Sequence, residues 1–577
     1  MNRIIIPQLK KRYDSILHKD FRAMVNHIAE AYGDDTAFII KHKEKGEVSY
    51  ENISFKEFHA DVNAIGTAML ARGWQGKRIA VVGANSYHWM ATFFATLGGV
   101  GTTVPLDKGL PYEELESCLA RSYAEVLVFD KGHKDLIAKL IEEGKTDVKE
   151  FICMNDLDGY TTLDQLRAEG KAALEAGSTE YQNVPIDEQA ITILLFTSGT
   201  TSMAKAVMLS QYNILANIEA LMASEDIRRG DVNMAFLPYH HTFGSVGQTL
   251  MLAQGVTTAY CDGLKYLQKN LVEYKVSVFF CVPLLIESIY KRVMQNVKKQ
   301  GKEKTVAFGI KLSQFLLKFG IDIRRKLFKE ILDQLGGDLR FVISGAAAID
   351  PEALEGFKHF GIEAVQGYGM TETSPVLTAE NLYEYRTGSI GHSMPGVEVA
   401  IEDPDENGVG EIVARGPNVM AGYYENEEET SKTLIDGWLH TGDLGYADKD
   451  GYIFICGRKK NVIILKNGKN VYPEEIEVLF ANLDYVEECM VYGYQRKEDD
   501  PLDLAVGVKI VYKTDVLKEN FGAETMEQIK AVVDADIDKI NATMPTYKQI
   551  TKTILTDEPM VKTTTGKVKR FEESKNL

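Results

Sequence analysis

The feature that most limits the fold of this chain is a short loop between two strand patterns. The strand pattern over residues 191–196 runs directly into TSGTTSMAK, and the next stretch, AVMLS, again has the pattern of a short strand. Hydroxyl groups, a glycine and a closing lysine suit a loop that surrounds phosphate oxygens. The loop is not a P-loop of the GxxxxGK[ST] kind, because Ala204 precedes Lys205 and a strand follows. Taken alone, such a loop is also typical of an ordinary surface turn.

Helix and strand patterns alternate between residues 55 and 130. FKEFHADVNAIGTAML and HWMATFFATLGGV carry apolar residues at helical spacing, whereas RIAVVGA and EVLVFD have the pattern of buried strands. This alternation predicts a layered α/β domain with a largely parallel sheet. Because 577 residues exceed what one hydrophobic core usually organises, we expect at least two folding units.

A second, smaller unit is predicted near the end of the chain. Asp450-Gly451 and Asn467-Gly468 are hairpin turn signals between β-rich runs, and Pro473 followed by two glutamates is typical of a helix start. The lysine-rich stretch 457–461 lies between the turns. We therefore expect a junction there, followed by a small α+β domain.

Composition excludes several classes of protein. The formal net charge of −18 repels the phosphate backbone of nucleic acid, so no nucleic acid partner is expected. The six cysteines form no CxxC or similar pair, which argues against a zinc knuckle or a disulfide framework. The N-terminal apolar run is too short for a signal peptide, and no stretch reaches the ~18 apolar residues of a spanning helix. These observations predict a cytoplasmic protein.

The chain resembles the adenylate-forming superfamily of acyl-CoA synthetases, luciferases and peptide-synthetase adenylation domains. The resemblance runs from about residue 52 to residue 570 and rests on ordered motifs: LLFTSGTTSMAKAVMLS, LPYHHTFG, ISGAAAID, QGYGMTETSP, GWLHTGDLGYADKDGYIFICGRKKNVIILKNGKNVYPEEIE and MVKTTTGKVKR. Within the superfamily, NGKNVYPEEIE and the long insert before ISGAAAID are most similar to long-chain fatty acyl-CoA synthetases.

The resemblance implies a large N-terminal domain over residues 1–457, built of α/β layers plus a β-barrel-like part. A hinge over 458–461, with Lys460 at the hinge position, would connect it to a small mobile α+β domain over 462–577. It implies an AMP-forming acid–thiol ligase with ATP, Mg²⁺ and coenzyme A. A fatty acid, ATP and CoA are thus the expected partners.

The resemblance also assigns roles to particular residues. Lys567, Thr371 and Glu372 are the expected catalytic residues, and Glu372 is the expected Mg²⁺ ligand, an oxygen donor of the kind this cation prefers. Lys567 and Mg²⁺ would stabilise charge on the α-phosphate as pyrophosphate leaves. The expected ATP- and AMP-binding residues are Thr197, Ser198, Gly199, Thr200, Thr201, Lys205, Gly345, Ala346, Gln366, Gly367, Tyr368, Gly369, Asp443 and Arg458.

The acyl pocket and its gate are expected at His241, Phe243 and Gly244, and a purely structural role for His241 is the competing interpretation. The phosphate loop departs from the usual TSGTTGxPKG, because Ser202, Ala204 and Ala206 replace Gly, Pro and Gly. Either these positions use ordinary dihedral angles or the loop is shifted, since a side chain at φ > 0 costs on the order of 1 kcal/mol.

Several alternatives stay open from the sequence, among them an aryl or bile-type acid as substrate in place of a long-chain fatty acid. The acyl group could pass to a carrier protein or an amine instead of CoA, or the chain could be a homologue that binds nucleotide and acyl group with impaired turnover. Residues 290–336 combine basic and bulky apolar side chains at helical periods. This pattern is consistent with helices that contact a membrane surface, with a hydrophobic substrate entrance, or with helices that cover a domain and have a solvated basic face.

Overall fold

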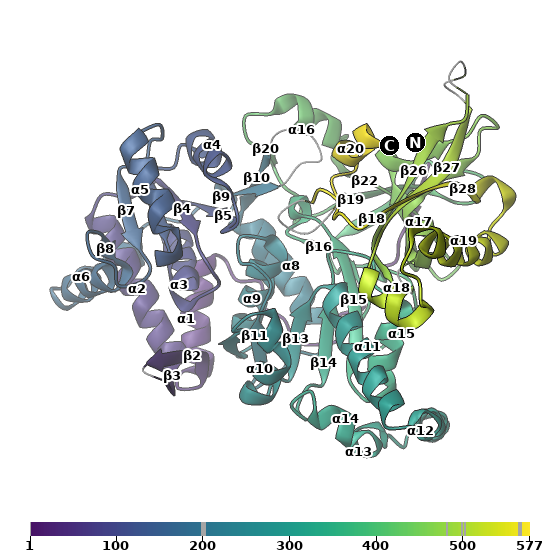
Figure 1. The fold of residues 1–577 in the computed structure, drawn as a ribbon. Coiled ribbons are helices and arrows are strands. Elements are labelled where there is room, and N and C mark those ends of the chain that lie inside the picture. The colour runs from purple at the N-terminus through teal and green to yellow at the C-terminus, as the bar shows by residue number, and fades with distance from the viewer. Residues whose placement is uncertain are drawn as a thin grey trace.

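A computed structural model describes residues 2–44, 46–197, 204–480, 483–497, 500, 503–562 and 568–577. The phosphate-loop residues Ser198, Gly199, Thr200, Thr201 and Ser202 and the expected catalytic Lys567 therefore lie outside the described residues. Two large sheets flanked by helices form the body of the molecule, and a smaller group of strands and helices lies at one end (Figure 1).

The first sheet confirms the largely parallel α/β layer predicted from residues 55–130. Its order is β20-β10-β9-β5-β4-β6-β7-β8, and only the β9–β10 and β10–β20 pairs are antiparallel. The strands are β4 (Arg78–Val82), β5 (Thr102–Leu106), β6 (Val126–Phe129), β7 (Glu150–Cys153), β8 (Thr161–Thr162), β9 (Ile191–Thr197), β10 (Lys205–Ser210) and β20 (Gly422–Tyr423).

The second sheet has nine strands in the order β17-β16-β15-β14-β13-β11-β12-β2-β3. These are β2 (Thr36–Glu44), β3 (Glu47–Ser54), β11 (Val232–Ala235), β12 (Thr257–Tyr260), β13 (Val278–Cys281), β14 (Phe341–Ser344), β15 (Glu363–Gly369), β16 (Val376–Ala379) and β17 (His392–Ser393). One continuous core of buried side chains joins both sheets and the helices between them.

Helices of both sheets begin where the sequence supplies caps. Ser54 and Glu57 form a capping box at α2, and Ser210 and Asn213 form one at α8. The main helices of this body are α1 (Phe21–Tyr32), α2 (Phe55–Ala71), α3 (Tyr87–Ala95), α4 (Tyr112–Ser122), α5 (Lys134–Glu143), α6 (Leu163–Glu175), α8 (Gln211–Ser224), α9 (Thr242–Ala253), α10 (Leu267–Tyr274) and α15 (Pro351–His359).

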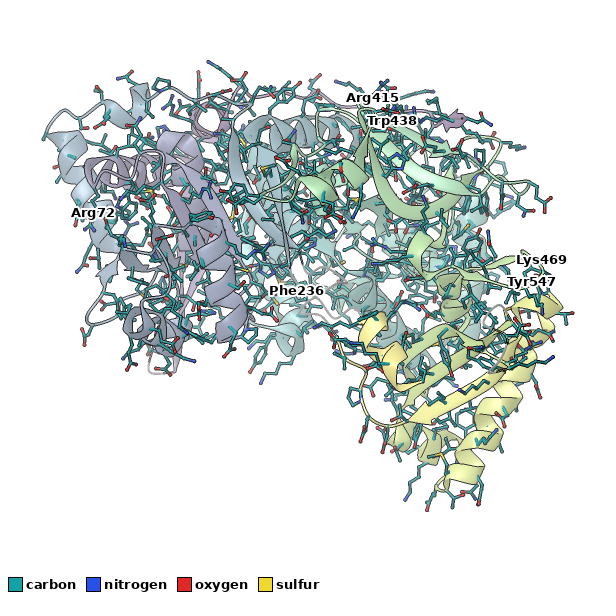
Figure 2. The ribbon with its side chains drawn as sticks, turned by 90° about the horizontal axis from the view of Figure 1, so that it is seen from above. Arg72, Phe236, Arg415, Trp438, Lys469 and Tyr547 are labelled. Carbon is teal, nitrogen blue, oxygen red and sulfur yellow. The ribbon has the colours of Figure 1, made fainter. Side chains whose placement is uncertain are left out.

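The β-barrel-like part is a six-stranded antiparallel sheet of β1 (Arg3–Ile5), β18 (Glu398–Glu402), β19 (Gly410–Arg415), β22 (Trp438–Ala447), β21 (Leu434–Ile435) and β23 (Ile453–Arg458). The guanidinium of Arg415 lies 4.8 Å from the ring centroid of Trp438 on this sheet (Figure 2). The adjoining helix α16 (Glu427–Thr433) brings Glu429 towards β10.

Beyond β23, the chain builds a separate small core. It contains β24 (Ile463–Ile464), β25 (Asn470–Val471), β26 (Val486–Gln495), β27 (Leu504–Tyr512), β28 (Ile550–Thr556), α17 (Pro473–Phe480), α18 (Thr514–Phe521) and α19 (Met526–Ala542), followed by α20 (Arg570–Glu573). Figure 2 shows this unit, with the labelled Lys469 and Tyr547, projecting from the body. The predicted helix start at Pro473 is confirmed.

The insert over residues 290–336 is helical, as its periodicity predicts. It contains most of α11 (Pro283–Lys299), then α12 (Glu303–Leu317), α13 (Arg324–Leu327) and α14 (Lys329–Asp333), and α12 lies at the edge of the molecule (Figure 1). In the part of the chain that the structure describes, no helix has both the length and the apolar character needed to cross a bilayer.

Candidate active site

A cavity opens where the helices α8 and α9 face the strands β13 to β16. Its empty volume, which includes the open space at its mouth, is about 680 Å³. Eight of the residues expected at the site line it: His241, Phe243, Gly345, Ala346, Gln366, Gly367, Tyr368 and Gly369. Strand ends and a helix start from distant parts of the chain therefore meet at one place.

At two positions in the wall of this cavity, only glycine leaves enough room for the neighbouring atoms. A Cβ atom on Gly369 would lie 1.8 Å from the carbonyl oxygen of Pro375, and one on Gly345 would lie 3.1 Å from the Phe243 ring. The neighbouring Ala346 has a φ of 71°, a left-handed conformation that costs a non-glycine residue roughly 1–2 kcal/mol. Strain of this kind is typical of functional sites.

Tyr368, Asp443 and Arg458 form one hydrogen-bonded group. The Tyr368 hydroxyl donates to Oδ2 of Asp443 at 2.7 Å, and Nε of Arg458 lies 2.7 Å from Oδ1 of the same carboxylate. Asp443 and Arg458 are direct partners across the β22–β23 pair. Burial and the adjacent Asp443 hold the pKa of Tyr368 well above its usual value, so the hydroxyl stays a donor. The structure thus brings together the three residues expected around a nucleoside.

Glu372 lies in a short 3₁₀ turn after β15 and is buried. Its Oε1 accepts a hydrogen bond of 2.8 Å from the hydroxyl of Tyr423 on β20. Among the described residues, none forms a salt bridge with this carboxylate. A buried carboxylate without a cationic partner fits a divalent cation, and Mg²⁺ prefers such an oxygen ligand. Thr371 is buried beside it.

The two strands that flank the phosphate loop confirm its predicted strand–loop–strand setting. Ala206 is a strand residue that pairs with Phe196, so this departure from the usual loop sequence needs no positive φ. Nζ of Lys205 forms a salt bridge with Glu429 of α16 and lies 5.0 Å from the centroid of the Tyr423 ring.

Lys460, in the expected hinge, lies among other cations. Burial lowers its pKa, and the positive charges of Arg458, Lys205 and Arg570 lower it further. Arg570 follows Lys567 by three residues and forms a salt bridge with Glu477 of α17. Lys460 therefore lies close to Arg458 and Asp443 of the nucleoside group and to Lys205.

The three residues expected at the acyl pocket do not all line the main cavity. Phe243 lines the cavity, and His241 caps α9 by accepting from the Phe243 amide through Nδ1 at 3.2 Å. Gly244 lies against the backbone of Pro238, where a Cβ would approach the carbonyl oxygen to 2.1 Å, and it lines a small neighbouring cavity. Gly244 thus allows α9 to start close to the preceding strand.

Sequence reasoning missed four residues here: Tyr423, Glu429, Glu225 and Glu380. Tyr423 contacts Glu372, Glu429 contacts Lys205, and Glu225 and Glu380 line the cavity. No local pattern marks them, because α8, β16, β20 and α16 meet the site only through the tertiary fold.

Comparison with known proteins identifies the family. A model described as AMP-binding enzyme matches residues 25–424, and one described as AMP-binding enzyme C-terminal domain matches residues 460–576. The chain belongs to the AMP-binding enzyme family.

Relatives and solved structures agree with this assignment. The chain is 27% identical over 493 residues to long-chain-fatty-acid–CoA ligase FadD15 of Mycobacterium bovis, covering 82% of this chain and 80% of the relative. It is 32% identical over 380 residues to the peroxisomal long chain acyl-CoA synthetase 6 of Arabidopsis thaliana, covering 61% and 53%. The fold resembles the anthranilate CoA ligase AuaEII with anthranoyl-AMP (TM-score 0.74, 19% identity, 97% and 98% covered) and ATP-bound MatB from Rhodopseudomonas palustris (0.72, 24%, 96% and 99%).

Proposed function

We propose that this protein is an acyl-CoA ligase that converts a long-chain fatty acid, ATP and CoA into acyl-CoA, AMP and pyrophosphate. The observation that carries the proposal is the Tyr368–Asp443–Arg458 group, whose member Tyr368 lines a cavity with mostly apolar walls. Such a cavity offers an ionic, hydrogen-bonding end to a nucleotide and an apolar end to an acyl chain. The family and the named long-chain relatives agree with this reading.

The chain's own residues act by position and charge. Asp443 accepts from ribose hydroxyls while Arg458 holds it in place, and Tyr368 presents its ring to the adenine. The acid is already a carboxylate at neutral pH, so it needs no general base to attack the α-phosphorus. Glu372 would hold Mg²⁺, which neutralises charge on the phosphates when bound. Thr371 and Lys567 would contact the α-phosphate, and Lys205 the departing pyrophosphate.

We also propose the domain division at 458–461 with Lys460 as hinge. The separate core after β23 and the cations that surround Lys460 support a junction at which a small rotation changes which face of the C-terminal unit meets the cavity. One face would present Lys567 for adenylation and another would admit the thiol.

Pyrophosphate release tests the reaction. Purified protein with ATP and Mg²⁺ is offered acids from acetate to palmitate, with CoA or a phosphopantetheinylated carrier protein as acceptor. We expect release with long-chain acids and a thioester on CoA. Lys567→Ala should lower release at least about 100-fold, the loss of a charge that acts in the transition state. Thioester on the carrier alone would overturn the CoA assignment. No release with any acid would leave a protein that only binds nucleotide and acyl group.

We further propose that the protein contacts membranes through α12. Phe308, Leu312 and Phe315 on this helix and Phe319 in the turn after it recur at helical spacing, and Phe308, Phe315 and Phe319 are 68%, 56% and 66% exposed. The exposed lysines Lys304, Lys311 and Lys318 flank these residues along the chain. An apolar stripe edged by lysines complements an anionic lipid surface, although the whole chain is acidic. We call these seven residues the α12 surface.

Vesicle sedimentation tests the α12 surface. We expect binding to vesicles with 30% anionic lipid and weak binding to purely zwitterionic ones, with ~1 kcal/mol from each lysine near the surface. Phe308→Ser with Phe315→Ser should weaken binding about 10-fold, whereas Phe521→Ser, an exposed aromatic of α18, should not. Equal binding of both variants would overturn this surface.

A further inference from the structure

Two carboxyl groups lie in the acyl side of the cavity. Glu225 follows the last residue of α8 and is 2% exposed, and Glu380 follows β16 and is 1% exposed. Both line the cavity with Leu221, Val246, Phe280 and Val376. Carboxyl groups at such a depth are unexpected in a pocket for an unsubstituted alkyl chain, because buried polar groups need partners.

The depth of these groups follows from the strand register. The amide of Glu380 donates to the carbonyl oxygen of Gln366 at 2.9 Å. Gln366 precedes Gly369 by three residues on β15, which is about 10 Å along a strand. Glu225 stands one helical turn beyond Leu221, another residue of the cavity wall. The carboxyl groups are therefore remote from Gly369 and the Thr371 turn, where adenylation is proposed.

The two carboxyl groups differ in their partners. Oε1 of Glu380 accepts from the backbone amide of Arg386 at 2.9 Å and from the hydroxyl of Ser389 at 3.3 Å. Oε2 of Glu225 is buried and has no hydrogen-bond partner among the described residues. Glu225 as a residue lines the cavity, and a buried oxygen without a partner in such a residue points to a ligand group that supplies the missing bond once the side chain turns towards it.

The environment of Glu225 favours the neutral form of its carboxyl group. Burial, together with the nearby charges of Glu380 and Asp226, raises its pKa to about 8. Burial likewise raises the pKa of Glu380 to about 7. Asp226 is held by Arg228 and Arg340, and Tyr13 is a further titratable neighbour. A protonated carboxyl group can donate one hydrogen bond and accept another.

We propose that Glu225 is a specificity-determining residue that hydrogen-bonds a hydroxyl group carried on the acyl chain. The proposal rests on the proposed acyl-CoA ligase function and narrows its substrate to hydroxylated fatty acids. A hydroxyl group both donates and accepts, so it matches a neutral carboxyl group. An unsubstituted chain would displace any water and leave Oε2 of Glu225 unpaired, which is how a polar site rejects an analogue lacking the polar group.

Competition between matched acids tests this. Wild type, Glu225→Met, Glu225→Gln and the surface control Asp436→Asn are assayed by pyrophosphate release. The substrates are palmitate, its mono-hydroxy isomers along the chain, and the amino analogue of the preferred isomer. We expect wild type to prefer one hydroxy isomer over palmitate at least 10-fold in kcat/KM. Glu225→Met should reverse the preference, whereas Glu225→Gln retains part of it and Asp436→Asn stays within about 2-fold of wild type.

The outcomes separate the two proposals. A hydroxy-to-palmitate ratio that is equal in wild type and Glu225→Met would overturn the role of Glu225 and leave a water molecule or a structural role as its explanation. Preference for the amino analogue would overturn the hydroxyl class. If no acid releases pyrophosphate, the ligase function fails, and calorimetric binding of hydroxy-palmitate and palmitate without ATP still tests Glu225. Circular dichroism and melting curves establish that each variant is folded.

Discussion

The proposed nucleotide side of the site and the cavity wall on the proposed acyl side differ in how their polar groups are paired. On the nucleotide side, both Asp443 oxygens have partners, and Tyr423 orients Glu372. On the acyl side, the walls are mostly apolar, and Oε2 of Glu225 is left without a partner among the residues described. The first side is organised before a ligand arrives, whereas the second has a polar group that a ligand must satisfy.

This difference separates catalysis from selection. Groups that stabilise charge in a transition state act best when they are fixed in advance, since no reorganisation is then needed during reaction. A group that selects among substrates acts by being costly when unpaired. Substitutions on the nucleotide side should therefore lower the rate for every acid, whereas those at Glu225 should change the order of preference among acids.

The largest effect is expected at Asp443. Asp443→Ala removes the acceptor shared by Tyr368 and Arg458 and leaves the guanidinium unpaired at the site. Charge-assisted hydrogen bonds contribute about 1.5–3 kcal/mol each, so kcat/KM for ATP should fall at least about 100-fold with every acid. Pyrophosphate release measures this. Asp436→Asn, in an exposed turn, is the control and should behave as wild type. A loss confined to one acid would contradict the comparison.

A smaller effect is expected on stability at Glu225. Its folded pKa of about 8 lies above its unfolded value, so its contribution to stability is full below the unfolded value, near pH 4.5, and is lost as pH rises through 8. Wild type should therefore lose more stability than Glu225→Gln between pH 7 and pH 9, by about 2 °C or more in melting temperature. Thermal melts at both pH values measure it. Parallel curves would show that Glu225 does not titrate in this window.

The sequence predicts the nucleotide side better than the acyl side, for a physical reason. Asp443, Arg458, Tyr368 and Glu372 stand in local motifs whose resemblance assigns each a role. Their contacts are set elsewhere: a bulge between Leu444 and Gly445 fixes the register that pairs Asp443 with Arg458. A shift of one residue would turn either side chain to the other face of the sheet.

Glu225 shows where sequence reasoning ends. In ASEDIRRGD it has the appearance of one charged residue among several near a helix end, and nothing in the segment marks it as buried. Its burial comes from the packing of α8 on β16, where the side chain of Asn217 bonds the backbone of Val376. By contrast, the strands on both sides of the phosphate loop could be predicted from the sequence, because their pattern is local.

Tyr423→Phe should lower kcat/KM moderately and so test how far the fixed orientation of Glu372 contributes to catalysis. It deletes one hydroxyl group that donates to Glu372 at 2.8 Å and keeps the ring beside Lys205. A hydrogen bond to a charged group of about 1.5 kcal/mol corresponds to a fall of roughly 10-fold in kcat/KM. The Mg²⁺ concentration for half-maximal rate should rise with it. Tyr424→Phe, the adjacent tyrosine, is the control, and an equal loss there would indicate a packing effect.

The smallest effect is expected at Glu429, and it has the opposite sign. The Glu429 carboxylate pairs with Nζ of Lys205, so under the proposed role of Lys205 the pyrophosphate group of ATP would compete with Glu429 for this ammonium group. The pair is partly exposed, and such pairs contribute about 1 kcal/mol or less. Glu429→Gln should therefore lower KM for ATP about 2- to 3-fold and leave kcat unchanged, as steady-state pyrophosphate release would show. Glu428→Gln, which breaks the neighbouring pair with Lys432, should change neither constant. A higher KM in Glu429→Gln would mean that Glu429 positions Lys205 for ATP. Lys205 would then be held in place before ATP binds, like Asp443 and Glu372.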